Sequence, residues 1–308
     1  MERIKILDEE LPVKDYYCSD SPTKLRRTKP SLRLYIKLTD QCLANCKFCA
    51  NGQSKDFGSI DLDKLAFIIS YLKDKNILHG ISITGGEPMT NPDTLFQMLD
   101  LIYQIDEHME VAISTNGYNC KEFKKYNKVN QLESIHISRH HYDDKKNQDI
   151  FGTNTIATTT DIMDLQQSLK DKKIININTM IMKSGINSLD EIKKMLTYVG
   201  DLKVYKTGFV SLMKCNPYAE REFINFNSIF ENLDSSFFPG HHFYSKEYCE
   251  CVDGIYLTEH NKLVEYYARM IKECDCPYTT QLVYTSDNKL TGCLLYTSPS
   301  PRDRQKSR

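Results

Sequence analysis

The sequence CLANCKFCA, residues 42–50, places three cysteines on one short segment with the spacing C-x3-C-x2-C. It directly follows LRLYIKLTDQ, residues 32–41, whose apolar half indicates a buried strand. A structural zinc site almost always has four protein ligands, and neighbouring ones usually come in C-x2-C pairs. Three thiolates on one loop instead suit an iron–sulfur cube with one iron open to another ligand. The triplet alone leaves zinc and buried cysteines as alternatives.

Around this segment the sequence alternates short β-rich runs with amphipathic helical stretches. We predict strands at residues 32–38, 80–84, 110–115, 134–138, 174–182 and 203–213. We predict helices at residues 61–75, 91–105, 159–171 and 188–200, and a short helical piece near 120–127. About six strand–helix units of this kind imply an α/β fold with a parallel sheet and crossover helices. Periodicity alone does not separate an open sandwich from a curved, barrel-like sheet.

Three regions complete the chain around this core domain, which we place at residues 32–213. Residues 1–31 are expected to form an amino-terminal extension that lies over the core. Residues 214–292 form a less regular, cysteine-rich carboxyl-terminal region with one predicted helix at 261–274, NKLVEYYARMIKEC.

The last sixteen residues, 293–308, differ in character from the Lys/Asn/Ile-rich chain before them. Their first residues, CLLYTS, are the translation of the sequencing-adapter sequence TGTCTCTTATACACATCT. We therefore interpret the tail as non-native and the region before it as truncated, so that Cys293 carries no weight as a ligand.

The composition excludes several classes of protein. The 308 residues include 40 Lys and Arg against 41 Asp and Glu, which gives no electrostatic reason to expect nucleic acid or a membrane surface. The amino terminus lacks the apolar block of a secretory signal, and no apolar run is long enough to span a membrane. We expect a cytoplasmic protein, where eleven cysteines call for a role other than disulfides.

Polar or glycine-rich segments follow each of the first four predicted strands. The cysteine triplet follows the first strand, and GGEP, residues 85–88, follows the second. TNG, residues 115–117, and SRHH, residues 138–141, follow the third and fourth. Since the carboxyl ends of parallel strands meet at one edge of a sheet, these four segments are expected to form one site.

CLANCKFC together with GGEP resembles the radical S-adenosylmethionine (radical SAM) superfamily, whose signature is C-x3-C-x-aromatic-C. Phe48 fills the aromatic position, and the resemblance covers roughly residues 30–212. It implies a partial (βα)6 TIM-like barrel, with Cys42, Cys46 and Cys49 holding three irons of a [4Fe–4S] cluster. It also implies that SAM chelates the fourth iron and is cleaved reductively to a 5′-deoxyadenosyl radical, which abstracts hydrogen from substrate. Such an enzyme is oxygen-sensitive and needs an electron donor such as flavodoxin or ferredoxin.

The resemblance also implies SAM contacts for residues that have ordinary structural readings. Phe48 would pack near the adenine, although a core aromatic is the alternative. Gly85 and Gly86 would let the backbone approach the methionine amino group, Glu87 would accept a hydrogen bond from SAM or nearby backbone, and Pro88 would stiffen the loop. Asn116 and Ser138 would contact the SAM carboxylate and ribose, or simply cap neighbouring helices.

Two further groups have two readings each. Arg139, His140 and His141 bind an anion or move a proton in a substrate pocket, or they are structural residues of a loop. The carboxyl-terminal cysteines Cys249, Cys251, Cys274 and Cys276 hold an auxiliary iron–sulfur cluster, hold zinc, or are unliganded. The C-x-C spacing brings both thiols to one metal only from a turn.

The sequence therefore predicts a radical SAM enzyme acting on an unidentified substrate, possibly a peptide or protein. Its motifs resemble the branch of molybdenum-cofactor GTP cyclases and SPASM-type peptide-modifying enzymes. The alternatives are a GTP 3′,8-cyclase-like enzyme and a non-catalytic iron–sulfur or zinc-binding protein on the same scaffold.

Overall fold

The computed structural model describes most of the core and short pieces of both flanking regions. The described residues are 2–6, 9–13, 32–51, 58–170, 174–225, 227–230, 242–243, 254–257, 263–267 and 281–291.

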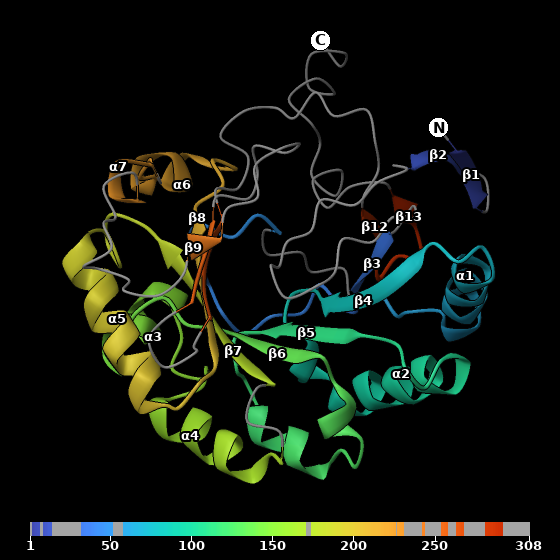
Figure 1. The fold of residues 1–308 in the computed structure, drawn as a ribbon, viewed down its shortest axis with the longest axis horizontal. Helices are drawn as coiled ribbons and strands as arrows, with labels where there is room; N and C mark the ends of the chain where they lie inside the picture. Colours follow the sequence, from blue (N-terminus) through green and yellow to red (C-terminus); the bar gives the residue numbers. More distant parts are fainter. Residues whose placement is uncertain are drawn as a thin grey trace.

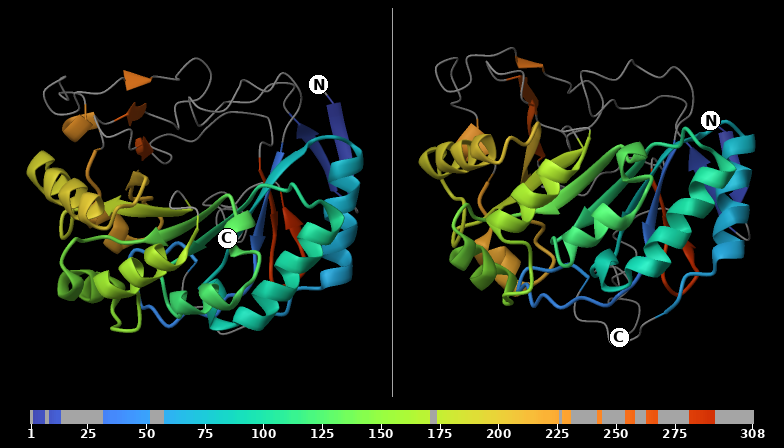
Figure 2. Two further views of the ribbon diagram at one scale, coloured as in Figure 1. Left: turned by 60° about the horizontal axis from the view of Figure 1, so that its bottom comes forward. Right: turned by 90° about the horizontal axis from the view of Figure 1, so that it is seen from below.

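An eleven-stranded sheet forms the centre of the protein, and its six middle strands are parallel and follow chain order. These strands are β3 (Leu32–Lys37), β4 (Leu78–Thr84), β5 (Val111–Thr115), β6 (Ser134–Ser138), β7 (Ile175–Ile181) and β8 (Lys206–Ser211). The sheet is curved and open, as Figures 1 and 2 show. The partial (βα)6 barrel is therefore confirmed.

Helices cover the convex face of the sheet (Figure 1). They are α1 (Leu62–Asp74), α2 (Pro92–Ile105), α3 (Asp144–Phe151), α4 (Thr159–Ser168) and α5 (Leu189–Asp201), with 3-10 turns η1 (Pro88–Thr90), η2 (Cys120–Lys125) and η3 (Val129–Gln131). The predicted core strands and helices are confirmed to within three residues at each end. Helix α3 was not predicted, because its eight residues carry too short an apolar pattern.

Strand alternation gives the two faces of the sheet opposite character. On β6 and β7 the isoleucines at 135, 137, 175 and 177 are fully buried in the core that the helices share. The intervening residues, Ser134, His136, Asn176 and Asn178, project to the concave face, since successive side chains of a strand alternate.

Strands from the carboxyl-terminal region extend both ends of this sheet. β12 (Gln281–Tyr284) pairs in parallel with β3 and forms a hairpin with β13 (Leu290–Thr291). At the other end β11 (Leu263–Tyr267) pairs in parallel with β8, followed by β10 (Gly254–Leu257) and β9 (His242–Phe243). Elsewhere β1 (Glu2–Ile6) pairs with β2 (Glu9–Val13), and α6 (Pro217–Glu222) and α7 (Asn227–Phe230) follow β8.

The helix predicted at 261–274 is wrong over residues 263–267, which form β11. The segment LVEYY contains one valine and two tyrosines, which favour strands, and β8 offers an edge with which it can pair. Residues 268–274 lie outside the described part of the chain.

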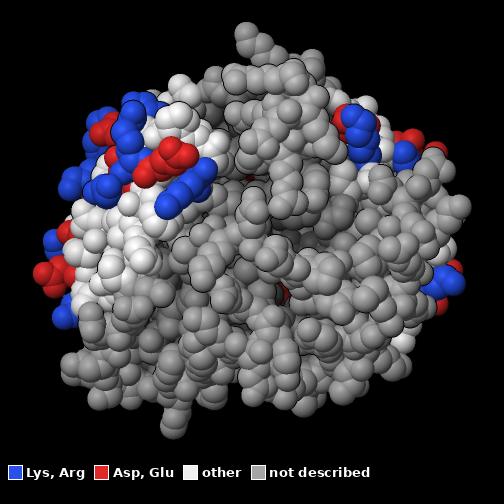
Figure 3. Space-filling view, turned by 90° about the horizontal axis from the view of Figure 1, so that it is seen from above, with Lys and Arg blue, Asp and Glu red and all other residues white. Residues whose placement is uncertain are grey.

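The described surface is mixed in charge. On the face shown in Figure 3, Lys and Arg side chains are interspersed with Asp and Glu. None of the described helices is long and apolar enough to cross a membrane.

Candidate functional site

The cysteine loop, residues 38–51, is bonded along its backbone to the tip of β4. Leu38 N donates to Thr84 O at 2.9 Å, continuing the sheet beyond the end of β3. Two backbone amides of GGEP also donate hydrogen bonds to the cysteine loop. Gly86 N donates to Thr39 O at 2.6 Å, and Glu87 N donates to Gln41 O at 2.8 Å. The first two predicted site segments therefore form one rigid unit.

Gly85 and Gly86 are required by the close approach of the cysteine loop. Gly85 has φ +151°, and a Cβ there would lie 2.5 Å from Thr39 O. A Cβ on Gly86 would lie 2.3 Å from Gln41 O. The sequence reading explained both glycines by a close approach of SAM. The contact that the structure shows is between the two loops themselves, and Asn51 adds a side-chain hydrogen bond to Gly85 O at 3.1 Å.

Glu87 joins the tip of β4 to the tip of β5. Its carboxylate accepts from Met89 N at 3.0 Å, from Thr115 Oγ1 at 2.6 Å and from Asn116 N at 2.7 Å. Burial raises the pKa of Glu87 to about 7, although the three donors favour the charged form. Of the two acceptor roles expected for Glu87, the bond to nearby backbone is present.

The three thiols lie close enough to affect one another. Cys42 is exposed, while Cys46 and Cys49 are half-buried. Burial, the Glu87 carboxylate and Cys49 raise the pKa of Cys42, and burial with the two other thiols raises the pKa of Cys46 to about 12. The Asn116 side-chain amide donates to Cys42 Sγ at 3.7 Å.

This donor set fits an iron–sulfur cluster. Burial and mutual repulsion disfavour the thiolate forms of Cys42 and Cys46, and bound iron would supply the positive charge that deprotonates them. Within the described ranges, no three His, Cys, Asp or Glu side chains gather closely enough to chelate a single metal ion. A cube takes one thiolate at each of three irons, so its ligands need not converge on one point.

The end of helix α3 holds the middle of the cysteine loop. Asn45 N donates to Phe151 O at 2.8 Å, and Cys46 Sγ lies 3.9 Å from the same carbonyl. Gly152, at φ +64°, ends the helix there, and a Cβ on it would lie 3.0 Å from Asn45 O.

Phe48 packs into an apolar cluster beside His140. Its ring meets His140 edge-to-face at 5.4 Å, and His140 stacks on Phe151 at 4.7 Å. His140 Nδ1 accepts from Met180 N at 3.2 Å, and burial lowers the pKa of His140 to about 3, so the ring is neutral. The remaining neighbours of Phe48 are Met182, Leu212 and Ala219.

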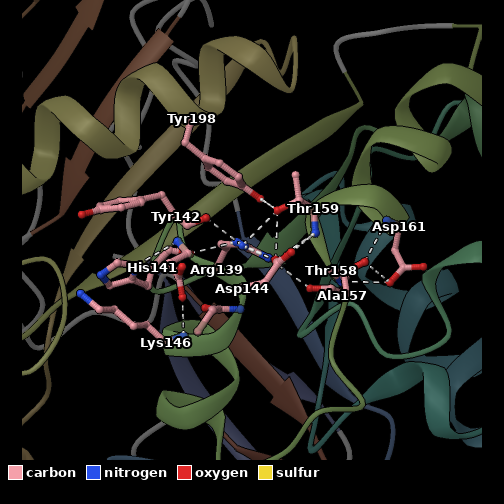
Figure 4. Close-up of polar contacts among 12 residues, drawn as sticks. Arg139, His141, Tyr142, Asp144, Lys146, Ala157, Thr158, Thr159, Asp161 and Tyr198 are labelled. Atoms are coloured by element: carbon pink, nitrogen blue, oxygen red, sulfur yellow. Dashed lines mark hydrogen bonds and ion pairs between the residues drawn. The ribbon is translucent and has the colours of Figure 1, made fainter.

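Arg139 is a structural residue, as Figure 4 shows. It is almost fully buried and donates to the backbone carbonyls of His141, Tyr142 and Ala157 at 3.0, 3.1 and 3.2 Å. It also pairs with Asp144 at 2.5 Å. All of these partners belong to the chain itself, so the anion-binding reading of Arg139 is not supported.

The other predicted site residues have mixed outcomes. Asn116 lies at the tip of β5, where its Oδ1 also accepts from Tyr118 N at 2.9 Å. Ser138 is the half-buried last residue of β6, in register with Asn178 of β7. The predicted auxiliary ligands Cys249, Cys251, Cys274 and Cys276 lie outside the described residues.

Sequence reasoning missed a fourth thiol beside the cysteine loop. Exposed Cys215, after β8, donates to Phe48 O at 3.5 Å, and the Asn216 side chain donates to Lys47 O at 3.2 Å. As a lone cysteine without a motif it carried no signal, apart from its position after the sixth strand.

Similar proteins are known by sequence and by fold. A GTP 3′,8-cyclase of Helicobacter pylori is 27% identical over 167 residues, which cover 53% of this chain and 50% of that protein. A GTP 3′,8-cyclase of Staphylococcus haemolyticus is 24% identical over 283 residues, covering 87% of this chain and 80% of its own. The chain thus spans about half the length of the Helicobacter relative.

Among solved structures, Streptococcus suis SuiB bound to S-adenosylmethionine matches with a TM-score of 0.62 at 16% identity. The match covers 86% of this chain and 60% of that one, and SuiB bound to its precursor peptide SuiA matches equally well. At this identity the likeness concerns the fold alone.

The radical SAM family profile matches residues 36–199, which include the cysteine loop and all four strand tips. Because this match spans more than half of the chain, the protein belongs to the radical SAM superfamily, whose members use a [4Fe–4S] cluster and SAM.

Proposed function

We propose that this protein is a radical SAM enzyme in which Cys42, Cys46 and Cys49 bind three irons of the cluster and SAM binds at the fourth. When bound, the two groups would supply a 5′-deoxyadenosyl radical by one-electron reductive cleavage of SAM, to abstract hydrogen from a substrate. The observation that carries this proposal is the backbone union of the cysteine loop with GGEP at one edge of the sheet.

The chain's own residues hold this arrangement in place. Glu87 braces two strand tips with both carboxylate oxygens, and Asn116 directs an amide N–H at Cys42. The SAM contacts in this proposal come from the backbone of Gly85–Pro88, from Asn116 and Ser138, and from the Phe48 ring. Since Glu87 is already satisfied by protein donors, its part is positioning.

The substrate is a peptide or protein in this proposal, and an electron donor such as flavodoxin or ferredoxin serves it in the cytoplasm. The likeness in fold to SuiB, whose structure with a precursor peptide is known, supports this choice. A GTP 3′,8-cyclase-like activity is the second candidate, because the sequence relatives described above carry that name.

Anaerobic reconstitution with iron and sulfide, followed by dithionite and SAM, tests the enzyme reading. We expect 5′-deoxyadenosine from the wild-type protein, none from Cys42→Ala, and wild-type amounts from the matched control Cys120→Ala. Cys120 is a buried thiol at the first position of η2 and lies outside the triplet. Equal product from Cys42→Ala and wild type would reject the proposal and favour a non-catalytic protein.

A further inference from the structure

A band of polar side chains crosses the concave face of the sheet below the cysteine loop. On β6 and β7, His136 is in register with Asn176, and Ser138 with Asn178. Lys206 of β8 is in register with Asn176. Residues in register on neighbouring strands project to the same side of a sheet, so these side chains form one surface.

The polarity of this band is unusual for a packed barrel interior. Closed (βα)8 barrels fill their interior with layers of branched apolar side chains. Here the isoleucines of the same strands all lie on the helix side, and the inner residues His136, Asn178 and Lys206 are only half-buried. The concave face therefore resembles a ligand-binding surface, because a few hydrogen-bonding side chains lie on strands whose other face packs in the apolar core.

Hydrogen bonds fix the protonation of His136. The Asn178 amide nitrogen lies 3.3 Å from His136 Nδ1, and Ser134 Oγ lies 2.8 Å from Nε2. An amide N–H₂ only donates, so Nδ1 accepts and Nε2 carries the proton. Burial and nearby Lys206 lower the pKa of His136 to about 3, so the ring is neutral and holds Asn178 in place.

Asn176 has an acceptor that the described protein does not use. The residue is 5% exposed, and its Oδ1 has no hydrogen-bond partner among the described residues. Buried side-chain oxygens nearly always accept a hydrogen bond. The unpaired Asn176 Oδ1 on the concave face therefore indicates that a ligand supplies the donor.

Both cations that β3 contributes to this face have partners within the protein, while Lys206 of β8 adds a third positive charge to the band. Arg33 pairs with Glu133 at 2.5 Å and donates to Ser82 Oγ at 2.7 Å, and Lys37 pairs with Asp40. A polyphosphate is normally met by several unpaired cations. A neutral group with one N–H donor and one C=O acceptor suits this surface better.

We propose that His136, Asn176 and Asn178 form a subsite for an amide group of the substrate, with Asn176 Oδ1 accepting the amide N–H. We assign this amide to a peptide or protein; a guanine base offers a similar N–H and C=O pair, and competition by GTP decides between the two. This inference rests on the proposed radical SAM function and deepens it, because its test separates the two substrate classes.

Saturation-transfer NMR on the reconstituted, SAM-bound protein tests the subsite, with the neutral peptide acetyl-triglycine amide as the probe and GTP as the competitor. We expect Asn176→Leu, which removes the acceptor at similar volume, to weaken peptide binding about tenfold or more. Asn176→Asp keeps an acceptor and is expected to bind the probe within about threefold of wild type. Asn178→Ala serves as the second variant if Asn176→Leu does not fold.

Two results would overturn the inference. One is unchanged peptide binding in Asn176→Leu or, if that variant does not fold, in Asn178→Ala. The other is displacement of the peptide by micromolar GTP, which would assign the band to a nucleotide. Formation of 5′-deoxyadenosine without substrate is measured on the same samples. Absence of this product from the wild-type protein would reject the enzyme reading, whereas its presence together with unchanged peptide binding in the variant would reject the subsite alone.

Discussion

The Glu87 carboxylate accepts hydrogen bonds from donors at the tips of two strands, β4 and β5. These bonds limit which side chains can replace Glu87 without loss of stability. Met89 N and Thr115 Oγ1 share one oxygen, and Asn116 N takes the other. All three partners are donors, so the group at position 87 must offer acceptors on both sides. A carboxylate does this, whereas a carboxamide turns an N–H₂ toward a donor and leaves a buried pair unsatisfied.

We therefore expect Glu87→Gln to lower the free energy of unfolding of the cluster-free protein by about 1–3 kcal/mol at pH 8, measured by urea denaturation. The loss should be larger near pH 5, because the raised pKa of Glu87, about 7 against 4.5 in the unfolded chain, makes the wild type less stable as the pH rises between these two values, whereas glutamine does not titrate. Glu122→Gln, which removes a surface ion pair with Lys125, is the matched control with an expected change under about 0.5 kcal/mol. Equal losses in both variants would contradict the bracing role.

At the scale of elements, the β12–β13 hairpin supports the cysteine loop from the far end of the chain. Ser286 Oγ donates to Asp40 Oδ2 at 2.7 Å, and a Cβ on Gly58 would lie 2.2 Å from Ser286 O. At the start of α1, Asp61 N donates to Asn288 Oδ1 at 2.8 Å. The hairpin thus contacts the cysteine loop at Asp40 and the segment before α1 at Gly58 and Asp61.

Ser286→Ala should loosen the loop without unfolding the sheet, because it removes one hydrogen bond to Asp40 worth about 1 kcal/mol. We expect the reconstituted variant to lose iron to a chelator several-fold faster than wild type, followed by absorbance under anaerobic conditions. Lys289→Ala, which removes an exposed ion pair on the same hairpin, should lose iron at the wild-type rate. Identical rates in all three proteins would show that the hairpin does not support the cluster.

The elements also show where sequence reasoning succeeds and fails. The core strands and the tips that carry Cys42–Ala50 and GGEP were predictable, because apolar runs, caps and glycines mark them locally. β11 was read as a helix because LVEYY is too short for periodicity to decide, and its partner β8 lies far away in sequence. The pairing of Glu87 with Thr115, and the burial of Arg139, depend on contacts between segments that no local pattern records.

At the scale of the whole molecule, the curved sheet separates an apolar convex face from a polar concave one. The convex face supplies the core, the concave face carries His136 on β6, and His140 lies just beyond the end of that strand. His136 and His140 are both neutral in the folded protein, with pKa values lowered to about 3 by burial. In the unfolded chain they titrate near 6.5. Folding therefore excludes two protons that the unfolded chain takes up in mild acid.

The sign of the pH dependence follows from these shifts. Because the folded pKa of His140 is depressed, its contribution to stability is complete above about pH 6.5 and is lost as the pH falls below that value. One such histidine costs about 1.4 kcal/mol per pH unit, or about 2 kcal/mol between pH 6.5 and 5. His140→Gln keeps an acceptor for Met180 N and should flatten the unfolding profile by this amount. His108→Gln, at an exposed site, should leave the profile unchanged, and a parallel shift in both would refute the assignment.

The backbone bonds from the cysteine loop to Thr84, Gly86, Glu87 and Phe151 have a consequence for assembly. A loop that is bonded at its start and middle through its backbone, and near its end through the Asn51 side chain, loses most of its conformational entropy when the sheet folds and little more when iron binds. Binding of the cluster should then require little further ordering of the backbone, because the cysteine loop already has its final conformation. Reconstitution with iron and sulfide should therefore act on a site whose backbone has already formed.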